Sequence, residues 1–250
     1  MVYWSLFIFL FFLQGRMIEC STILGVKTSD SVLLSSTCDF APGNTMMRSD
    51  YDWIEYINDN TLIGLHGDSA DCQTLLENLK AADRDYRLNT ADIFEIDIDI
   101  NYSLENNEKY KKLLNIPPAS LAYYCRKIIA DMLRKRPLNV NCIIGGWDHD
   151  KCKPCLFVID RLASIREVPF AVHGQEFLTV LTLMDAAFGA RTGAMNELLP
   201  LKELINNDRG KQVLMSCWEV IRKRTTSGAA HKPVVIKGVN EKGILDLGSF

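Results

Sequence analysis

A chain of 250 residues with 48% hydrophobic residues and no low-complexity tract is long enough to bury a large core in one domain, or at most two. Its formal net charge of -3 gives no electrostatic support for binding a phosphate backbone, so we expect no nucleic-acid partner. The 8 cysteines are scattered and stand mostly in apolar segments, which favours a reducing compartment.

The first residues form an unusually apolar segment. The run VYWSLFIFLFFL is long enough for the core of a signal peptide but too short to span a bilayer comfortably. It lacks a basic n-region, and no small-x-small cleavage pattern follows it. An alternative is that translation begins at Met17. We therefore expect residues 1–16 to be a leader or an extension, residues 17–250 to form a single domain, and no membrane association.

Two strand pairs and a helix are predicted next. The stretch STILGVKTSDSVLLSST holds two apolar runs joined by a polar turn, and residues 53–57 and 61–66 form a second pair around Asn58, Asp59 and Asn60. From Ser69, a suitable N-cap, apolar residues recur at helical spacing as far as Tyr86.

Residues 91–114 interrupt this pattern. The segment is acidic, alternates at Ile96, Ile98 and Ile100, and then becomes polar. It can be read as an added strand with a short helix, but we expect a solvated insertion loop. A second helix follows in PPASLAYYCRKIIADMLRKR, opened by proline, with an apolar face and a basic, solvated end.

The second half repeats this alternation. Three strands are predicted in NVNCIIGGWD, CLFVID and SIREVPF as an antiparallel meander. Two helices follow, in GQEFLTVLTLMDAAF and in PLKELINNDRGKQVLMSCWEVIRKR, and the strands KPVVIKG and GILDL close the chain. Strands that return after pairs of helices predict an α+β fold in four layers, an αββα sandwich with two antiparallel sheets between helices.

Two local patterns could be taken for ligand sites. Cys152 and Cys155 have the C-x-x-C spacing of redox and zinc sites, with His149 nearby. Zinc needs four ligands and only three are local, so we interpret the stretch as a hairpin loop. Gly145 and Gly146 are not followed by the G-K-S/T of a phosphate loop and instead predict close approach of backbones. We expect no metal and no cofactor.

Several separate segments together resemble one family. STILGVKTSDSVLLSS, LIGLHGDSADCQTLLENL, RPLNVNCIIGGWD, FVIDRLASIREVPFAVHG and GILDL are similar to a 20S proteasome beta subunit, from about Ile23 to Leu247, interrupted mainly by the insertion. The order R-P-x-x-V-N-x-x-x-G-G-x-D, then I-D, then P-F-A-x-H-G, most resembles the non-catalytic subunit in the fourth position of the beta ring, beta type-2. This resemblance implies the N-terminal-nucleophile hydrolase fold, which agrees with the sandwich.

In active members of that family, self-cleavage exposes a threonine whose hydroxyl attacks while its own amino group serves as base. A lysine lowers the local pKa, and aspartates and serines hold the arrangement. The resemblance places Ser21 at the nucleophile, after Cys20 instead of a glycine. It places Thr37 at the first aspartate and Trp53 at the lysine.

The later catalytic positions are also altered. Arg224 stands for the second aspartate, although Ser227 and Gly228 persist, and the serine of the G-S-G segment is replaced at or near Phe177. Without the lysine, nothing favours deprotonation of the hydroxyl near neutral pH, and general-base help is worth roughly a hundredfold to ten-thousandfold. We also expect the Trp53 indole to occupy the pocket, and Ser21 to be an ordinary strand-start residue.

Two further polar residues have structural interpretations. Asp39 is displaced by two positions from Thr37, and we expect it to be a solvated turn residue. His173 precedes Gly174 at a strand-to-helix junction, where a packing or capping role is expected.

The resemblance implies an inactive structural subunit of the beta ring, with no catalytic residues and no cofactor, acting in the cytoplasm and nucleus. Its expected partners are neighbouring beta subunits, alpha-ring subunits and the opposite beta ring. One alternative is a self-processed amidohydrolase or threonine-type peptidase that uses Ser21, Thr22 or Cys20. A third hypothesis is a secreted, disulfide-bearing protein.

Overall fold

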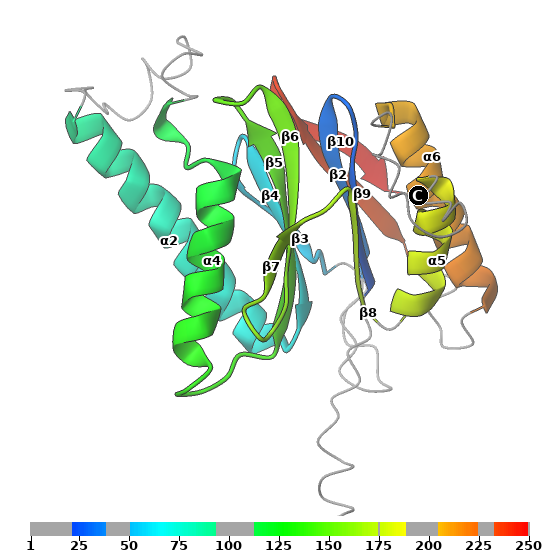
Figure 1. Cartoon of the computed structure of the whole chain (residues 1–250), viewed down its shortest axis with the longest axis horizontal. Helices are drawn as coiled ribbons and strands as arrows, with labels where there is room; N and C mark the ends of the chain where they lie inside the picture. The colour runs from blue at the N-terminus through cyan, green and yellow to red at the C-terminus, as the bar shows by residue number, and fades with distance from the viewer. Residues whose placement is uncertain are drawn as a thin grey trace, which may run out of the picture.

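The computed structural model describes residues 22–38, 51–93, 113–174, 176–188, 205–224 and 233–249. They form two five-stranded antiparallel sheets packed face to face, with a pair of helices on the outer side of each sheet (Figure 1). The predicted four-layer αββα sandwich is confirmed. Residues 1–16 lie outside the described part, so the predicted division of the chain stays a prediction.

The strands are β1 Thr22–Lys27, β2 Ser31–Thr37, β3 Ile54–Asn58, β4 Thr61–Gly67, β5 Val140–Asp148, β6 Lys153–Ile159, β7 Ile165–Glu167, β8 Phe170–Gly174, β9 Val234–Asn240 and β10 Gly243–Ser249. The helices are α2 Ser69–Ile93, α4 Pro118–Met132, α5 Phe177–Ala187 and α6 Asn207–Arg224.

The first sheet has the strand order β10-β9-β2-β1-β8 and the second has β3-β4-β5-β6-β7. In the first, Ile23 of β1 lies opposite Ser36 of β2 on one side and His173 of β8 on the other. The first residues of β1 are therefore held between β2 and β8. The predicted nucleophile, Ser21, directly precedes these residues in the sequence.

The segment SIREVPF, predicted as one strand, is two strands in different sheets. β7 pairs with β6 in the second sheet, whereas β8 pairs with β1 in the first. The chain crosses between sheets at Val168 and Pro169: the Val168 N–H donates to the Leu156 carbonyl, and the Pro169 carbonyl accepts from Lys27 N–H. Proline has no N–H to continue a ladder, so the strand is interrupted there.

The two sheets approach closely because glycine stands at contact points between them. A Cβ on Gly145 would lie 2.5 Å from Val32 Cγ1, and one on Gly64 would lie 2.8 Å from Ile23 Cγ2. A Cβ on Gly146 would lie 2.5 Å from the Asn60 carbonyl oxygen. The predicted close approach of backbones is therefore found at Gly146, whereas Gly145 makes room for the Val32 side chain of the opposite sheet.

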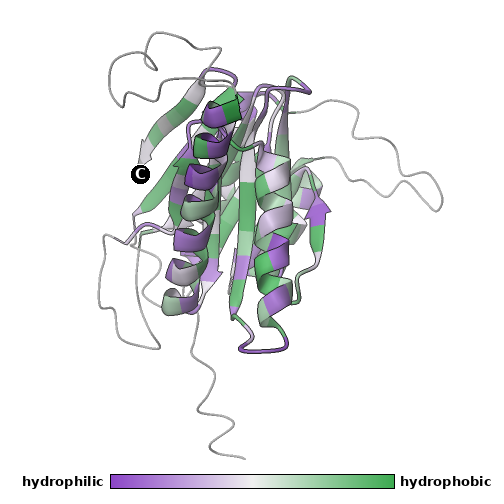
Figure 2. Ribbon diagram, turned by 90° about the vertical axis from the view of Figure 1, so that its left-hand side faces the viewer, coloured by the Kyte–Doolittle hydropathy of each residue, from purple (hydrophilic) through white to green (hydrophobic). Residues whose placement is uncertain are grey.

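The helices close the outer faces of the sheets, with α2 and α4 on the second sheet and α5 and α6 on the first (Figure 1). Apolar residues on α2 and α4 turn toward the sheet, and polar residues dominate the outer side (Figure 2). On the first sheet, Trp218 of α6 is fully buried and its Nε1–H donates to Ser35 Oγ at 2.9 Å. Among the described helices, none is both long and apolar enough to cross a membrane.

Helix boundaries differ from the prediction at several ends, and α4 stops at Met132 instead of continuing to Arg136. α2 continues beyond Tyr86 to Ile93, because buried Thr90 and Ala91 extend its packed face; residues 94–112 of the predicted insertion lie outside the described part. α6 begins at Asn207, and just before it the Ile205 carbonyl accepts from Ser29 N–H; residues 200–204 of the predicted helix lie outside the described part.

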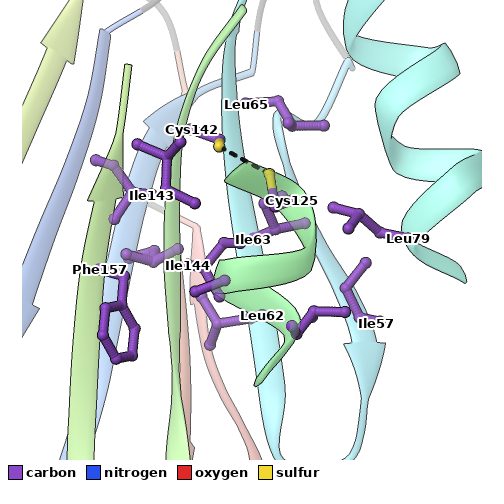
Figure 3. Packing of buried hydrophobic residues seen from close by; sticks show 14 of the residues in the cluster. Ile57, Leu62, Ile63, Leu65, Leu79, Cys125, Cys142, Ile143, Ile144 and Phe157 are labelled. Atoms are coloured by element: carbon purple, nitrogen blue, oxygen red, sulfur yellow. Dashed lines mark hydrogen bonds between the residues drawn. The ribbon is translucent and has the colours of Figure 1, made fainter. Parts of the chain in front are cut away.

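The core between the second sheet and its helices contains cysteines as small apolar residues (Figure 3). Cys125 of α4 and Cys142 of β5 are fully buried, with their sulfur atoms 3.5 Å apart. Both are thiols. The hydrogen bond with Cys125, followed by burial, raises the pKa of Cys142 well above its usual value, so the Cys142 thiol stays protonated.

Candidate active-site region

The predicted nucleophile region lies where β1, β2 and β8 end together. Thr22, the first residue of β1, is buried and lies opposite Gly174 of β8. Thr37, the last residue of β2, is 4% exposed, and its Oγ1 has no hydrogen-bond partner within the described residues. Ser21 lies outside those residues. The position expected for the first catalytic aspartate is thus a buried, neutral hydroxyl.

Trp53 is a packed residue at the entrance to β3. It is 6% exposed, its carbonyl accepts from Leu65 N–H at 3.0 Å, and its ring stands edge-on to Tyr51 with the centroids 4.7 Å apart. The indole lines a cavity of about 540 Å³ between β3 and α2. The residues lining it are Tyr51, Asp52, Trp53, Glu55, Leu65, Cys72, Gln73, Leu76, Glu77 and Lys80. An aromatic side chain therefore occupies the predicted lysine position, while its distance from Ser21 stays undescribed.

A lysine that the sequence did not single out lies at the same end of β3. Lys237 lies opposite Leu34 in the pairing of β9 with β2 and reaches across to the second sheet. Its Nζ is 2.6 Å from Asp52 Oδ2, donates to the Ile54 carbonyl at 2.9 Å, and lies 5.3 Å from the centre of the Tyr56 ring. Only the pairing of distant strands brings this cation here, and the predicted strand KPVVIKG by itself does not give its partners.

His173 is packed between the sheets and belongs to β8 itself. Burial, followed by the neighbouring His66, lowers the pKa of His173 to about 4, against an opposing contribution from Asp160. Its Nε2 has no hydrogen-bond partner within the described part of the chain. The neutral imidazole is therefore the stable form at physiological pH, as expected for a packing residue.

Two further predicted positions lie at the ends of helices on the first sheet. Arg224 is the exposed last residue of α6, and Phe177 is the first residue of α5, with 39% of its surface exposed. The described cations hydrogen-bond to neither Thr22 nor Thr37. Cys20, Asp39, Ser227 and Gly228, like Ser21, lie outside the described residues.

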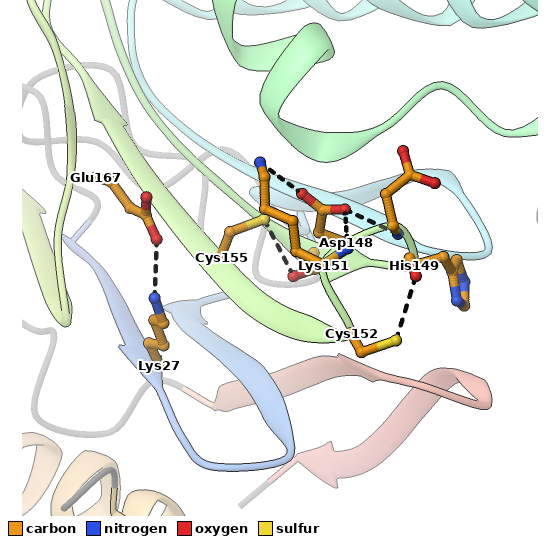
Figure 4. A network of polar contacts seen from close by, with 9 residues as sticks. Lys27, Asp148, His149, Lys151, Cys152, Cys155 and Glu167 are labelled. Carbon is orange, nitrogen blue, oxygen red and sulfur yellow. Dashed lines mark hydrogen bonds and ion pairs between the residues drawn. The ribbon is translucent and has the colours of Figure 1, made fainter.

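The C-x-x-C stretch is a hairpin, as predicted, although Cys155 belongs to strand β6 and not to the turn (Figure 4). Cys152 is exposed in the turn and its Sγ donates to the His149 carbonyl, whereas Cys155 Sγ donates to the Gly146 carbonyl. Burial raises the pKa of Cys155 to about 12. Across the described ranges, no three metal-binding side chains come together.

The arrangement of the sheets and helices identifies the structural class of the protein. Two antiparallel sheets between helix layers, with β1 paired between β2 and β8, form the sandwich of the N-terminal-nucleophile hydrolases. In agreement, the profile of the proteasome subunit family matches residues 18–100 and 89–201. The chain belongs to that family.

Curated relatives are beta subunits. The chain is 24% identical over 229 residues to proteasome subunit beta type-4 of Saccharomyces cerevisiae, covering 91% of this chain and 97% of the relative. It is 21% identical over 214 residues to a proteasome subunit beta of Methanobrevibacter smithii, covering 86% and 85%. It is 22% identical over 170 residues to proteasome subunit beta type-2 of Oryza sativa, covering 68% of each. The chain is thus a beta-type subunit of the core particle. Its relatives include subunits named type-4 and subunits named type-2, so the predicted beta type-2 position stays a prediction.

Proposed function

We propose that the chain is a non-catalytic structural subunit of the 20S proteasome beta ring. The observation that carries this proposal is the state of the two predicted catalytic positions, which hold a buried hydroxyl at Thr37 and a buried indole at Trp53. Neither side chain can supply the charge that the attacking oxygen of an active subunit needs. In this proposal, both positions serve packing.

The placement of Lys237 supports the same proposal. An ammonium group lowers the pKa of a hydroxyl by stabilising its anion, and a carboxylate paired with the ammonium weakens that effect. The ammonium of Lys237 is already bound by the Asp52 carboxylate, the Ile54 carbonyl and the Tyr56 ring. We therefore assign it to joining the two sheets and not to replacing the missing lysine.

In this role the chain would help to close the chamber in which other subunits cut peptides. Its partners would be neighbouring beta subunits, alpha-ring subunits and the opposite beta ring, in the cytoplasm and nucleus. The segment order in RPLNVNCIIGGWD and PFAVHG supports the fourth position of the ring. A cross-linking map of the native particle tests that position, and cross-links to subunits of a different ring position would contradict it.

The decisive experiment combines two measurements on the native chain. We expect it to elute at the mass of a proteasome particle and to stay unlabelled by a threonine-directed covalent inhibitor, while active subunits of the same particle are labelled. An intact mass that begins at Ser21 or Thr22, together with inhibitor attached there, would support the self-processed hydrolase instead. Elution as a small, free chain would contradict a ring subunit of either kind.

A further inference from the structure

A small pocket lies at the end of the second sheet where β3 turns into β4 and β5 turns into β6. Its volume is about 90 Å³. Four segments that are distant in the sequence line it: the β3–β4 turn, α2, the residues that lead into α4, and the β5–β6 turn. Its lining includes Asn60, Tyr86, Asn115, Trp147, Asp148 and Asp150. We call it the Trp147 pocket. It follows the last residue of β3, whereas Trp53 precedes the first, so it is separate from the degenerate site.

Backbone and side-chain contacts hold the walls of the Trp147 pocket in place. The Trp147 N–H donates to the Asn60 carbonyl at 2.9 Å, which joins the two turns. The buried Asp83 carboxylate of α2 accepts from Asn58 Nδ2 at 2.7 Å and from the Ile116 N–H at 3.4 Å. The segment before α4 is thereby fastened to α2 and to β3. A pocket formed before its ligand arrives loses little conformational entropy on binding.

Two buried amide side chains of the Trp147 pocket are not used by the fold. Asn60 and Asn115 are each 7% exposed. Neither side-chain amide has a hydrogen-bond partner in the described part of the chain. Buried polar groups are rarely left without a partner, so both amides depend on what enters the pocket, water or a ligand. The pair therefore points to a polar ligand.

The charge of the lining is negative. Asp148 is 4% exposed, and the Lys151 ammonium folds back onto its carboxylate at 3.0 Å, which makes this pair neutral (Figure 4). Asp150 is exposed, and its carboxylate forms no ion pair with a described residue. His149 carries no permanent charge, and no lysine or arginine is among the described lining residues. One negative charge thus remains at the rim.

The aromatic residues and the size of the pocket narrow the choice of ligand. Trp147 is 8% exposed and Tyr86 is half-buried. Aromatic rings attract cations, and arginine suits them best because its guanidinium is planar and weakly hydrated. Its five N–H donors can reach amide and carboxylate oxygens together. A volume of about 90 Å³ is well below the roughly 300–1,000 Å³ of small-molecule sites, so it admits the end of a side chain and not a whole cofactor.

We propose that the Trp147 pocket receives an arginine side chain from another protein chain. The guanidinium lies beside the two aromatic rings and donates to the side-chain oxygens of Asn60 and Asn115. The Asp150 carboxylate pairs with its charge at the rim. The assignment of this arginine to an adjoining subunit rests on the proposed function, whereas the recognition of a guanidinium does not.

The first test uses the purified full-length chain and the peptide acetyl-Gly-Arg-Gly-amide. The indole N–H signals of isotope-labelled tryptophan are followed by NMR during the titration, and the signal lost in Trp147→Phe identifies Trp147. We expect that signal to shift and saturate with a dissociation constant on the order of 1 mM, because one small group supplies the contacts.

Peptides with lysine or citrulline in place of arginine should bind about fivefold more weakly or worse. Lysine lacks the planar fork, and citrulline has nearly the same shape without the charge. Equal binding of either peptide, or a shift that does not saturate, would overturn the inference. Free arginine that binds more tightly than the peptide would indicate a metabolite site and would overturn it as well.

Variants of the lining test the individual contacts. Asp150→Asn should weaken binding several-fold, whereas Asp131→Asn, at an exposed position of α4 outside the pocket, should leave it unchanged. Asn115→Leu keeps the size of the side chain and should weaken binding about fivefold, with the urea midpoint unchanged or raised, because no described hydrogen bond is lost. Unchanged binding by either pocket variant, or a lowered midpoint for Asn115→Leu, would overturn the inference.

A photoreactive form of the arginine peptide tests the occupant in the assembly. It is irradiated with the free chain and with the native particle, and its attachment to this chain is measured by intact mass. Attachment in the particle should be about tenfold lower, because an arginine held at the site outcompetes a free peptide. Equal attachment would overturn the adjoining subunit as the source. A chain that never enters a large particle would instead refute the proposed function, while the result on the free chain stands, so the two failures are distinguishable.

Discussion

Trp53 offers the sharpest test of whether the predicted lysine position belongs to a packing unit. Replacing it with alanine removes a side chain that is 6% exposed and an edge contact with Tyr51 at 4.7 Å between centroids. An aromatic side chain buries about 150–250 Å², or about 4–6 kcal/mol at 25 cal/mol per Å². The adjoining cavity of about 540 Å³ admits solvent to one side of the indole. The free energy gained by burying Trp53 is therefore smaller than this full value.

We therefore expect Trp53→Ala to lower the free energy of unfolding by about 3 kcal/mol, at the lower end for buried aromatic residues. Trp53→Phe keeps a ring against Tyr51 and should cost about 1 kcal/mol. The assay is urea denaturation of the purified chain followed by circular dichroism. Tyr123→Ala, at an exposed position, should change stability by less than about 0.5 kcal/mol. A loss below about 1 kcal/mol for Trp53→Ala would refute the packing role.

A lysine at position 53 tests whether the predicted loss of the catalytic lysine by itself prevents activity. Trp53→Lys restores the type of residue that active members use but leaves Thr37 neutral. We expect no labelling by a threonine-directed inhibitor in assembled particles and a stability loss at least as large as that of Trp53→Ala, because a cation enters a buried site. Labelling of this variant would show that the lysine alone was lacking.

Three further results are expected. Gly145→Ala should destabilise the chain by about 2 kcal/mol through its clash with Val32, and Val32→Ala should relieve it; a double-mutant cycle additive to within about 0.5 kcal/mol would contradict this contact. His173 binds a proton more readily unfolded than folded, so stability present above pH 6.5 should fall as the pH drops toward 4, by up to about 3 kcal/mol; a His173→Gln chain with the same pH profile would exclude that residue as the cause. A thiol reagent should react quickly with exposed Cys152 and slowly with buried Cys155, and fewer than eight thiols after denaturation would favour the disulfide-bearing alternative.

Much of the architecture follows from local patterns in the sequence. Two apolar runs around KTSD predict β1 and β2, and helical spacing from Ser69 predicts α2, because each element must present one apolar face to the core. The glycines of CIIGGWD likewise indicated where neighbouring atoms approach closely. The residue types at Thr37 and Trp53 could also be read directly, although their assignment to the catalytic aspartate and lysine positions rests on the resemblance and stays a prediction.

What the sequence could not decide depends on contacts between distant segments. The division of SIREVPF between two sheets requires Lys27 to bind the Pro169 carbonyl, and no local period records that. The binding of Lys237 to Asp52 joins residues 185 positions apart, one in β9 and the other just before β3. Local periodicity fixes which face of an element is buried, whereas the partners of a charge depend on which strands become neighbours. Only the packed tertiary structure determines that.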